Sequence, residues 1–237
     1  MVDLLLYDPA YNKLYEFYLY SIIAFAVSAM LYYPRAKNLK KTYVKNISTP
    51  NLTGGDILTL MLKEAECDNV KIRVYKKPGM EKQKKSLLSE KYNHFYPDTN
   101  IIDVSSFAYF DNTVAGIAAV SRAAAFAILH KRDSFEVKFY QAIQIASWLA
   151  FALCFLFVVP YCISGYQNPV AFFLLLMFSI LSKLLVVQTE NRVNRLAAIY
   201  LEKTGLNEKD LKEVLRSNKI SAFSRKSILG LAETRIY

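Results

Sequence analysis

The sequence predicts a predominantly α-helical integral membrane protein with about three transmembrane helices and one small α+β domain. Its composition and the distribution of its apolar residues lead to this fold class. Of the 237 residues, 54% are hydrophobic and 14% are aromatic, and the apolar residues gather in long runs. Such runs are typical of membrane proteins, because a membrane-spanning segment must match the hydrocarbon core of a bilayer.

Three runs are long enough to cross a bilayer, at residues 14–33, 142–163 and 170–188. Each is close to the roughly 20 apolar residues that a transmembrane helix requires. The first run has tyrosines at both ends, which suits the position of aromatic residues at membrane interfaces. A cleavable signal peptide is the alternative for this run. The acidic residues Asp3 and Asp8 argue against it, because a signal peptide begins with basic charge.

The chain is therefore divided into an N-terminal transmembrane helix (1–34), a small domain (35–140), a transmembrane hairpin (141–188) and C-terminal amphipathic helices with a basic tail (189–237). Basic residues follow the first run, precede the second and follow the third. Because basic loops favour the cytoplasmic side, we expect the small domain and the C-terminus on the cytoplasmic or mitochondrial-matrix side. These basic residues are Arg35, Lys37, Lys40, Lys41, Lys45, Lys131, Arg132, Lys138, Arg192 and Arg195.

The formal charge of +10 largely reflects this asymmetry. A basic surface beside anionic lipid accounts for it without nucleic acid. The densest basic stretch, residues 76–85, is predicted to be a loop between strands. RNA binding there would require a platform of aromatic side chains, and a solvated loop beside the membrane is the simpler interpretation. We therefore expect membrane lipids as partners, and neither nucleic acid nor a small-molecule substrate.

Periodicity predicts the elements of the small domain. Apolar residues at helical spacing indicate a helix at residues 56–65, and alternation indicates strands at 70–74 and 101–105. An Ala-rich apolar helix is expected at 113–130. Beyond the third apolar run, Asn207 is expected to cap a further helix.

Two motifs in this region resemble those of the bacterial-type membrane zinc metallopeptidases, the neutral zinc metallopeptidase family. In that family a motif D-H-Y-D-P-x-T-x-x-x-x-L-S precedes a helix with the motif A-A-H-E-x-G-H-A. His94, Pro97, Thr99 and Ser105 match the first motif without a gap. Counting on from Ser105 without an insertion places the last six positions of the second motif, H-E-x-G-H-A, on residues 122–127.

Further segments agree with the same register. Residues 51–57 resemble the family's G-L-T-G-A-E-V, and residues 189–197 resemble its E-x-D-A-S-x-R-A-L, which supplies the third zinc ligand at Glu190. The resemblance covers residues 15–205 and implies that the small domain is zincin-like. The family usually ends in another apolar helix, and residues 211–237 are too polar for that.

The zinc-binding residues themselves are missing. Arg122 stands where the family has its first His, Ala123 where it has its Glu, and Phe126 where it has its second His. Catalytic zinc needs three protein ligands, and the Glu between the two His activates the bound water. The resemblance therefore implies a degenerate member without the HExxH motif, a pseudoenzyme that needs no metal or other cofactor.

Arg122 is unusual, because a guanidinium in an apolar helix is costly unless it is paired. In the family register Glu190 lies beside it, and we hypothesise that an ion pair between Arg122 and Glu190 replaces the zinc. In the alternative, Arg122 points to water or lipid headgroups. A zinc site built from His94, His130 and Glu190 is a further alternative, although it lacks the spacing typical of zinc ligands.

Three functions follow from these observations. The favoured one is a catalytically inactive homologue that serves as an accessory subunit of a membrane protein complex, with other subunits as partners. Family analogy suggests a respiratory-chain or ATP synthase complex of the mitochondrial inner membrane, and the bacterial cytoplasmic membrane is the other location. The alternatives are a regulatory pseudoprotease that binds a peptide or membrane client at the strand 101–105, and an active zinc peptidase with an unrecognised site.

Overall fold

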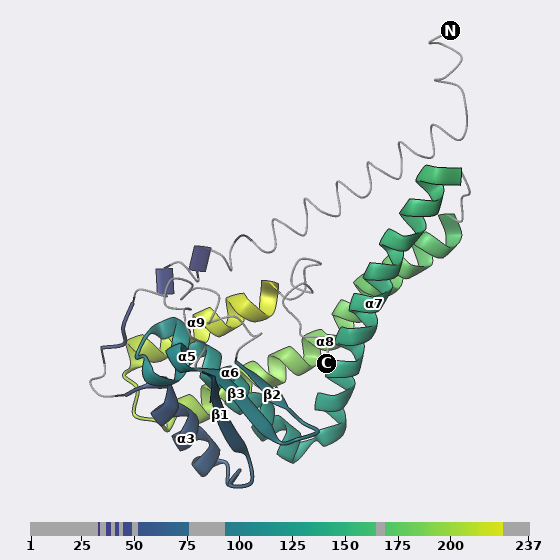
Figure 1. Ribbon diagram of the computed structural model, residues 1–237. Helices are drawn as coiled ribbons and strands as arrows, with labels where there is room; N and C mark the ends of the chain where they lie inside the picture. Colours follow the sequence, from purple (N-terminus) through teal and green to yellow (C-terminus); the bar gives the residue numbers. More distant parts are fainter. Residues whose placement is uncertain are drawn as a thin grey trace.

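The computed structural model describes residues 33, 37–38, 41–42, 45–48, 52–75, 93–164 and 169–224. This part of the chain is mostly helical, with one three-stranded sheet. In chain order its elements are α3 (Gly54–Glu64), β1 (Lys71–Tyr75), β2 (His94–Tyr96), β3 (Ile101–Ser105), α5 (Ser106–Phe110), α6 (Val114–Arg132), α7 (Ser134–Ser164), α8 (Pro169–Glu202) and α9 (Glu208–Ser224). Figure 1 shows the sheet packed with α3, α5, α6 and α9 in one body, from which α7 and α8 extend together.

The sheet has the strand order β1-β3-β2. β1 is parallel to β3, with Ile72 opposite Ile102, and β2 is antiparallel to β3, with Phe95 opposite Ile102. The two predicted strands are confirmed within a residue. The strand 101–105 is not free to take a peptide as a further strand, because β1 and β2 pair with β3 on its two sides and leave it in the centre of the sheet.

Helix α3 begins two residues before the predicted start, at Gly54. Thr53 caps it: its hydroxyl accepts a hydrogen bond from the backbone N–H of Asp56, and the Asp56 carboxylate accepts one from the backbone N–H of Thr53. Such a reciprocal box satisfies two backbone donors that a helix start leaves unpaired. Gly54 lets α3 approach α5 closely, since a Cβ atom there would lie only 1.9 Å from the carbonyl oxygen of Ala108.

Helix α6 is the core of the domain. Thr113 caps its N-terminus, and almost every residue from Val114 to Leu129 is buried. The many alanines allow α3, α7, α8 and α9 to pack around it. Within the described ranges, α6 is the one helix that is long and apolar enough to cross a membrane, and 83% of its apolar window is buried inside the protein. Its apolar surface is therefore used for packing within the domain.

The second and third apolar runs, residues 142–163 and 170–188, lie inside α7 and α8, which pack along each other (Figure 1). Both helices continue past the runs into the domain, so the predicted boundaries at 140/141 and 188/189 fall within continuous helices. Large apolar side chains are exposed on this hairpin, namely Leu149, Leu153, Phe178, Leu181 and Leu185. Apart from its last residue, the first run, 14–33, lies outside the described residues. Its crossing of a membrane, like that of α7 and α8, stays a prediction.

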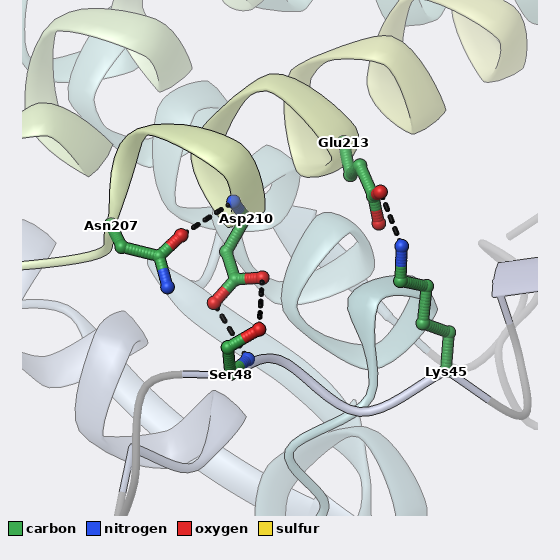
Figure 2. A network of polar contacts seen from close by, with 5 residues as sticks. All are labelled: Lys45, Ser48, Asn207, Asp210 and Glu213. Atoms are coloured by element: carbon green, nitrogen blue, oxygen red, sulfur yellow. Dashed lines mark hydrogen bonds and ion pairs between the residues drawn. The ribbon is translucent and has the colours of Figure 1, made fainter.

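Residues 45–48 form a clasp between α9 and the rest of the body. In Figure 2, the Asp210 carboxylate accepts a hydrogen bond from the backbone N–H of Ser48 at 2.7 Å, and Lys45 forms an ion pair with Glu213. The side chain of Asn207 accepts a hydrogen bond from the backbone N–H of Asp210 at 2.8 Å, which confirms the predicted cap. Backbone hydrogen bonds join the same segment to the junction of α5 and α6.

Candidate functional site

Four side chains from three helices meet inside the domain. Arg122 and Phe126 come from α6, Tyr140 from α7 and Glu190 from α8. Nη2 of Arg122 lies 2.7 Å from Oε1 and 2.5 Å from Oε2 of Glu190. The Tyr140 hydroxyl donates a hydrogen bond to Oε1 of Glu190 at 2.5 Å. The Phe126 ring closes the group, with its centroid 5.1 Å from both the guanidinium carbon of Arg122 and the Tyr140 ring.

Local sequence places each member of this cluster. Arg122 and Phe126 are four residues apart, so they lie on one face of α6, one turn from each other. Glu190 is followed at helical spacing by Val193 and Ala197, and all three are buried on one side of α8. Arg122 and Glu190 are 68 residues apart in the chain, so the packing of α6 on α8 brings them together.

The ion pair is almost completely removed from water. The side chains of Arg122 and Glu190 are 6% and 2% exposed. Burying two charges has a large desolvation cost, which is offset only by close contact and by hydrogen bonds that satisfy both groups. The Glu190 carboxylate receives hydrogen bonds from the guanidinium and from the phenol. Burial, and then the charge of Glu190, raise the pKa of Tyr140 well above its ordinary value, so this hydroxyl remains a neutral donor.

The predicted site residues can now be placed. The contact predicted between Arg122 and Glu190 is present, and the alternative in which Arg122 points to water or headgroups is wrong. Phe126 joins them, and Ala123 lies in the adjoining core with a 2% exposed side chain. Tyr140 was missed by the sequence analysis. It lies outside both motifs, and no local pattern indicates that its hydroxyl reaches Glu190.

The alternative zinc site is not assembled. Among the residues that the structure describes, no group of three or more His, Cys, Asp or Glu side chains is placed to hold a metal ion. The ring of His130 packs against Phe95 at 5.4 Å, and the ring of His94 lies beside the amide of Gln141. Burial is also the main cause that lowers the pKa of His130. His94, His130 and Glu190 therefore occupy separate environments.

One edge of the sheet is formed by β2, which packs on α6, and Gln141 of α7 contacts this strand. The side-chain amide of Gln141 donates a long hydrogen bond, 3.5 Å, to the carbonyl oxygen of Phe95 in this strand. An extended peptide that joins a sheet uses the main-chain groups of the edge strand. A peptide pairing with β2 at this position would have to displace Gln141.

Comparison with family models, with curated proteins and with solved structures gives no match to this chain. The interpretation of the cluster therefore rests on the motifs in the sequence and on the geometry of the four side chains.

Proposed function

We propose that this chain is a catalytically inactive homologue of the bacterial-type membrane zinc metallopeptidases and serves as a structural subunit of a membrane protein complex. One observation carries the proposal. The resemblance assigns the three zinc-ligand positions to residues 122, 126 and 190, and the fold brings these same three positions into contact. A coincidental motif match gives no reason for two distant segments to converge there.

The chemistry at these positions fits a structural role. Arg122 carries a permanent positive charge and contacts both oxygens of Glu190, so it joins α6 to α8 as a shared cation would. Neither a guanidinium nor a phenyl ring ligates zinc, and the methyl group of Ala123 does not accept a proton from water. The cluster thus holds three helices together without a group that performs hydrolysis.

The hairpin supports membrane insertion. No Asp, Glu, Lys, Arg or His occurs between Lys138 and Lys183, a stretch that covers most of α7 and the first part of α8. At about 1.5 Å of rise per residue, residues 142–163 extend over roughly 33 Å, and the hydrocarbon core of a bilayer is about 30 Å thick. With the basic residues around it, the domain lies on the cytoplasmic or matrix side. By family analogy the complex is a mitochondrial respiratory-chain or ATP synthase complex, or one of the bacterial cytoplasmic membrane.

Zinc binding tests whether residues 122, 126 and 190 correspond to the zinc-ligand positions of the family. The full chain, purified without chelators, is expected to carry substoichiometric zinc by elemental mass spectrometry and to cleave no peptide. The double substitution Arg122→His with Phe126→His restores two ligands beside Glu190 and should gain about one zinc per chain. Adding Glu190→Ala to that variant removes the third ligand and should abolish the gain.

Two outcomes would reject this part of the proposal. Stoichiometric zinc in the unaltered chain, together with peptide cleavage that a chelator stops, would show an active peptidase. A folded double-histidine variant that gains no zinc would show that positions 122, 126 and 190 are not a former metal site.

Purification from native membranes in mild detergent tests the role as a subunit. A constant set of partner proteins in fixed proportion on native gels indicates a structural subunit. An exchanging set indicates a regulatory pseudoprotease. Recovery of the chain alone, under conditions that keep other membrane complexes intact, would contradict the proposal.

A further inference from the structure

Helix α9 presents a row of basic side chains on its exposed face. Lys209, Lys212, Arg216 and Lys219 are spaced by three, four and three residues, which places them on one face of the helix. All four are exposed. The residues of α9 that are buried against the body are Asp210, Val214, Ser217, Asn218 and Ala222. We refer to the four exposed residues as the basic row.

Most of the charge in this row is not neutralised by other described residues. Lys212 forms an ion pair with Glu208. Within the described part of the chain, Lys209, Arg216 and Lys219 form no ion pair. Basic side chains elsewhere on the domain form ion pairs, for example Lys131 with Glu66, Lys203 with Glu64 and Arg192 with Glu136. Among the described residues, no carboxylate competes with an external anion for Lys209, Arg216 and Lys219.

Two further basic residues lie beside the second half of α9. The side-chain amide of Asn38 donates a hydrogen bond to the hydroxyl of Ser217 at 3.1 Å. Lys37 and Lys41 flank Asn38, at one and three residues along the chain, and both are exposed. They extend the positive surface beside α9.

The position of α9 relative to the hairpin identifies what this surface faces. The clasp of residues 45–48 and the Asn207 cap hold the start of α9 against the body (Figure 2). In Figure 1, α9 crosses the side of the body toward which the free end of the hairpin of α7 and α8 rises, and α3 lies on the opposite side. With the hairpin in a bilayer, α9 would lie on the side of the body that faces the membrane.

We propose that the basic row, together with Lys37 and Lys41, binds the phosphate headgroups of acidic phospholipids at the membrane surface. Lysine and arginine next to a bilayer gain affinity from each anionic lipid that they contact. Nucleic acid fits less well, because no aromatic residue occurs between Lys209 and Lys219 on which a base might stack. This inference rests on the proposed membrane insertion of α7 and α8.

The experiment measures the thermal stability of the full chain in mild neutral detergent while a short-chain lipid is added. A ligand that binds the folded state raises the melting temperature. Short-chain phosphatidylglycerol is expected to raise it, whereas phosphatidylcholine of the same chain length is not. Arg216→Gln with Lys219→Gln should weaken the apparent affinity for phosphatidylglycerol by roughly 10- to 30-fold, from about 1 kcal/mol per charge.

Two control variants isolate the effect of position and charge. Lys63→Gln with Lys71→Gln removes two exposed charges at the end of α3 and the start of β1, away from α9, and should leave the response unchanged. Arg216→Lys with Lys219→Arg keeps the charge and should also retain the response. The assignment to α9 would be overturned if the Arg216/Lys219 and Lys63/Lys71 variants lost affinity for phosphatidylglycerol equally, or if neither lost affinity.

Other probes distinguish a lipid headgroup from free phosphate and from nucleic acid. Inorganic phosphate that reproduces the shift at the same concentration, or an RNA oligonucleotide that binds more tightly than phosphatidylglycerol, would overturn the proposal. Alkaline carbonate extraction of native membranes tests the underlying insertion. If the chain is extracted from the membrane, the proposed membrane insertion is wrong. If the chain is retained but responds equally to phosphatidylglycerol and phosphatidylcholine, only the proposed lipid-binding surface is wrong.

Discussion

Loss of one partner from the buried ion pair is expected to destabilise the protein strongly. Glu190→Gln keeps the shape of the side chain but removes its charge. The guanidinium of Arg122, of which only 6% of the side chain is exposed, then loses its contact with the Glu190 carboxylate and cannot regain that hydrogen bonding from water without repacking. Breaking a buried pair in this way costs about 3–5 kcal/mol. For a chain of this size, each kcal/mol lowers the melting temperature by about 2–4 °C, so the expected fall is roughly 6–20 °C.

A double-mutant cycle shows whether that cost comes from an isolated charge. Arg122→Met and Glu190→Met are made singly and together, and unfolding is followed by circular dichroism in detergent. The double variant buries no charge and is expected to be more stable than either single variant. Arg192→Gln is the matched control, because the Arg192 side chain is about half exposed in its pairs with Glu136 and Asp133, and an ion pair in contact with water is worth about 1 kcal/mol.

The reasoning is refuted if Glu190→Gln costs no more than Arg192→Gln, or if the two methionine substitutions are additive. Additivity would mean that the two side chains contribute independently and that their contact does not stabilise the packing of α6 on α8.

Three further predictions concern single residues. Tyr140→Phe removes the hydroxyl that donates to a buried carboxylate and should lower the free energy of unfolding by about 1.5–3 kcal/mol in denaturant titrations; an unchanged value would contradict the hydrogen bond. Gly54→Ala places a methyl group 1.9 Å from the backbone oxygen of Ala108 and should destabilise by about 1–3 kcal/mol or more, measured in the same way; tolerance would contradict the close packing of α3 on α5. Hydrogen bonds from Thr53 lower the pKa of Asp56 below 3.8, so its ionised form stabilises the folded state above that pH, and this contribution is lost as the pH falls through the folded-state pKa. The difference in melting temperature between the unaltered chain and Asp56→Asn should accordingly shrink below pH 3.8, and a difference that grows would contradict the sign.

Elements that depend on local pattern were predicted well. The amphipathic helix α3, the strands β1 and β3, the Ala-rich helix α6 and the Asn207 cap all follow from spacing or capping chemistry within a few residues. The three-residue strand β2 and the short helix α5 were not predicted as separate elements, because each is too short for a periodic signal.

The candidate site was predicted in part, and by a different route. Spacing alone places Arg122 and Phe126 on one face of α6, but it does not indicate what that face meets. Glu190 was assigned only through the resemblance to the metallopeptidase motifs. Tyr140 was not found, since its role depends on how α7 turns back after α6, and no motif covers it.

What the sequence by itself determined about this protein is the longer helices, the strands β1 and β3 and the charge-free stretch of the hairpin, because these depend on residues close together in the chain. The tertiary structure alone decided that β3 lies at the centre of the sheet, that Gln141 reaches the edge strand, and that Tyr140 completes the cluster around Glu190. These features depend on which distant segments pack together. Such contacts are set by the shape of the whole core, in which a buried charge is tolerated only where its partner arrives from another helix.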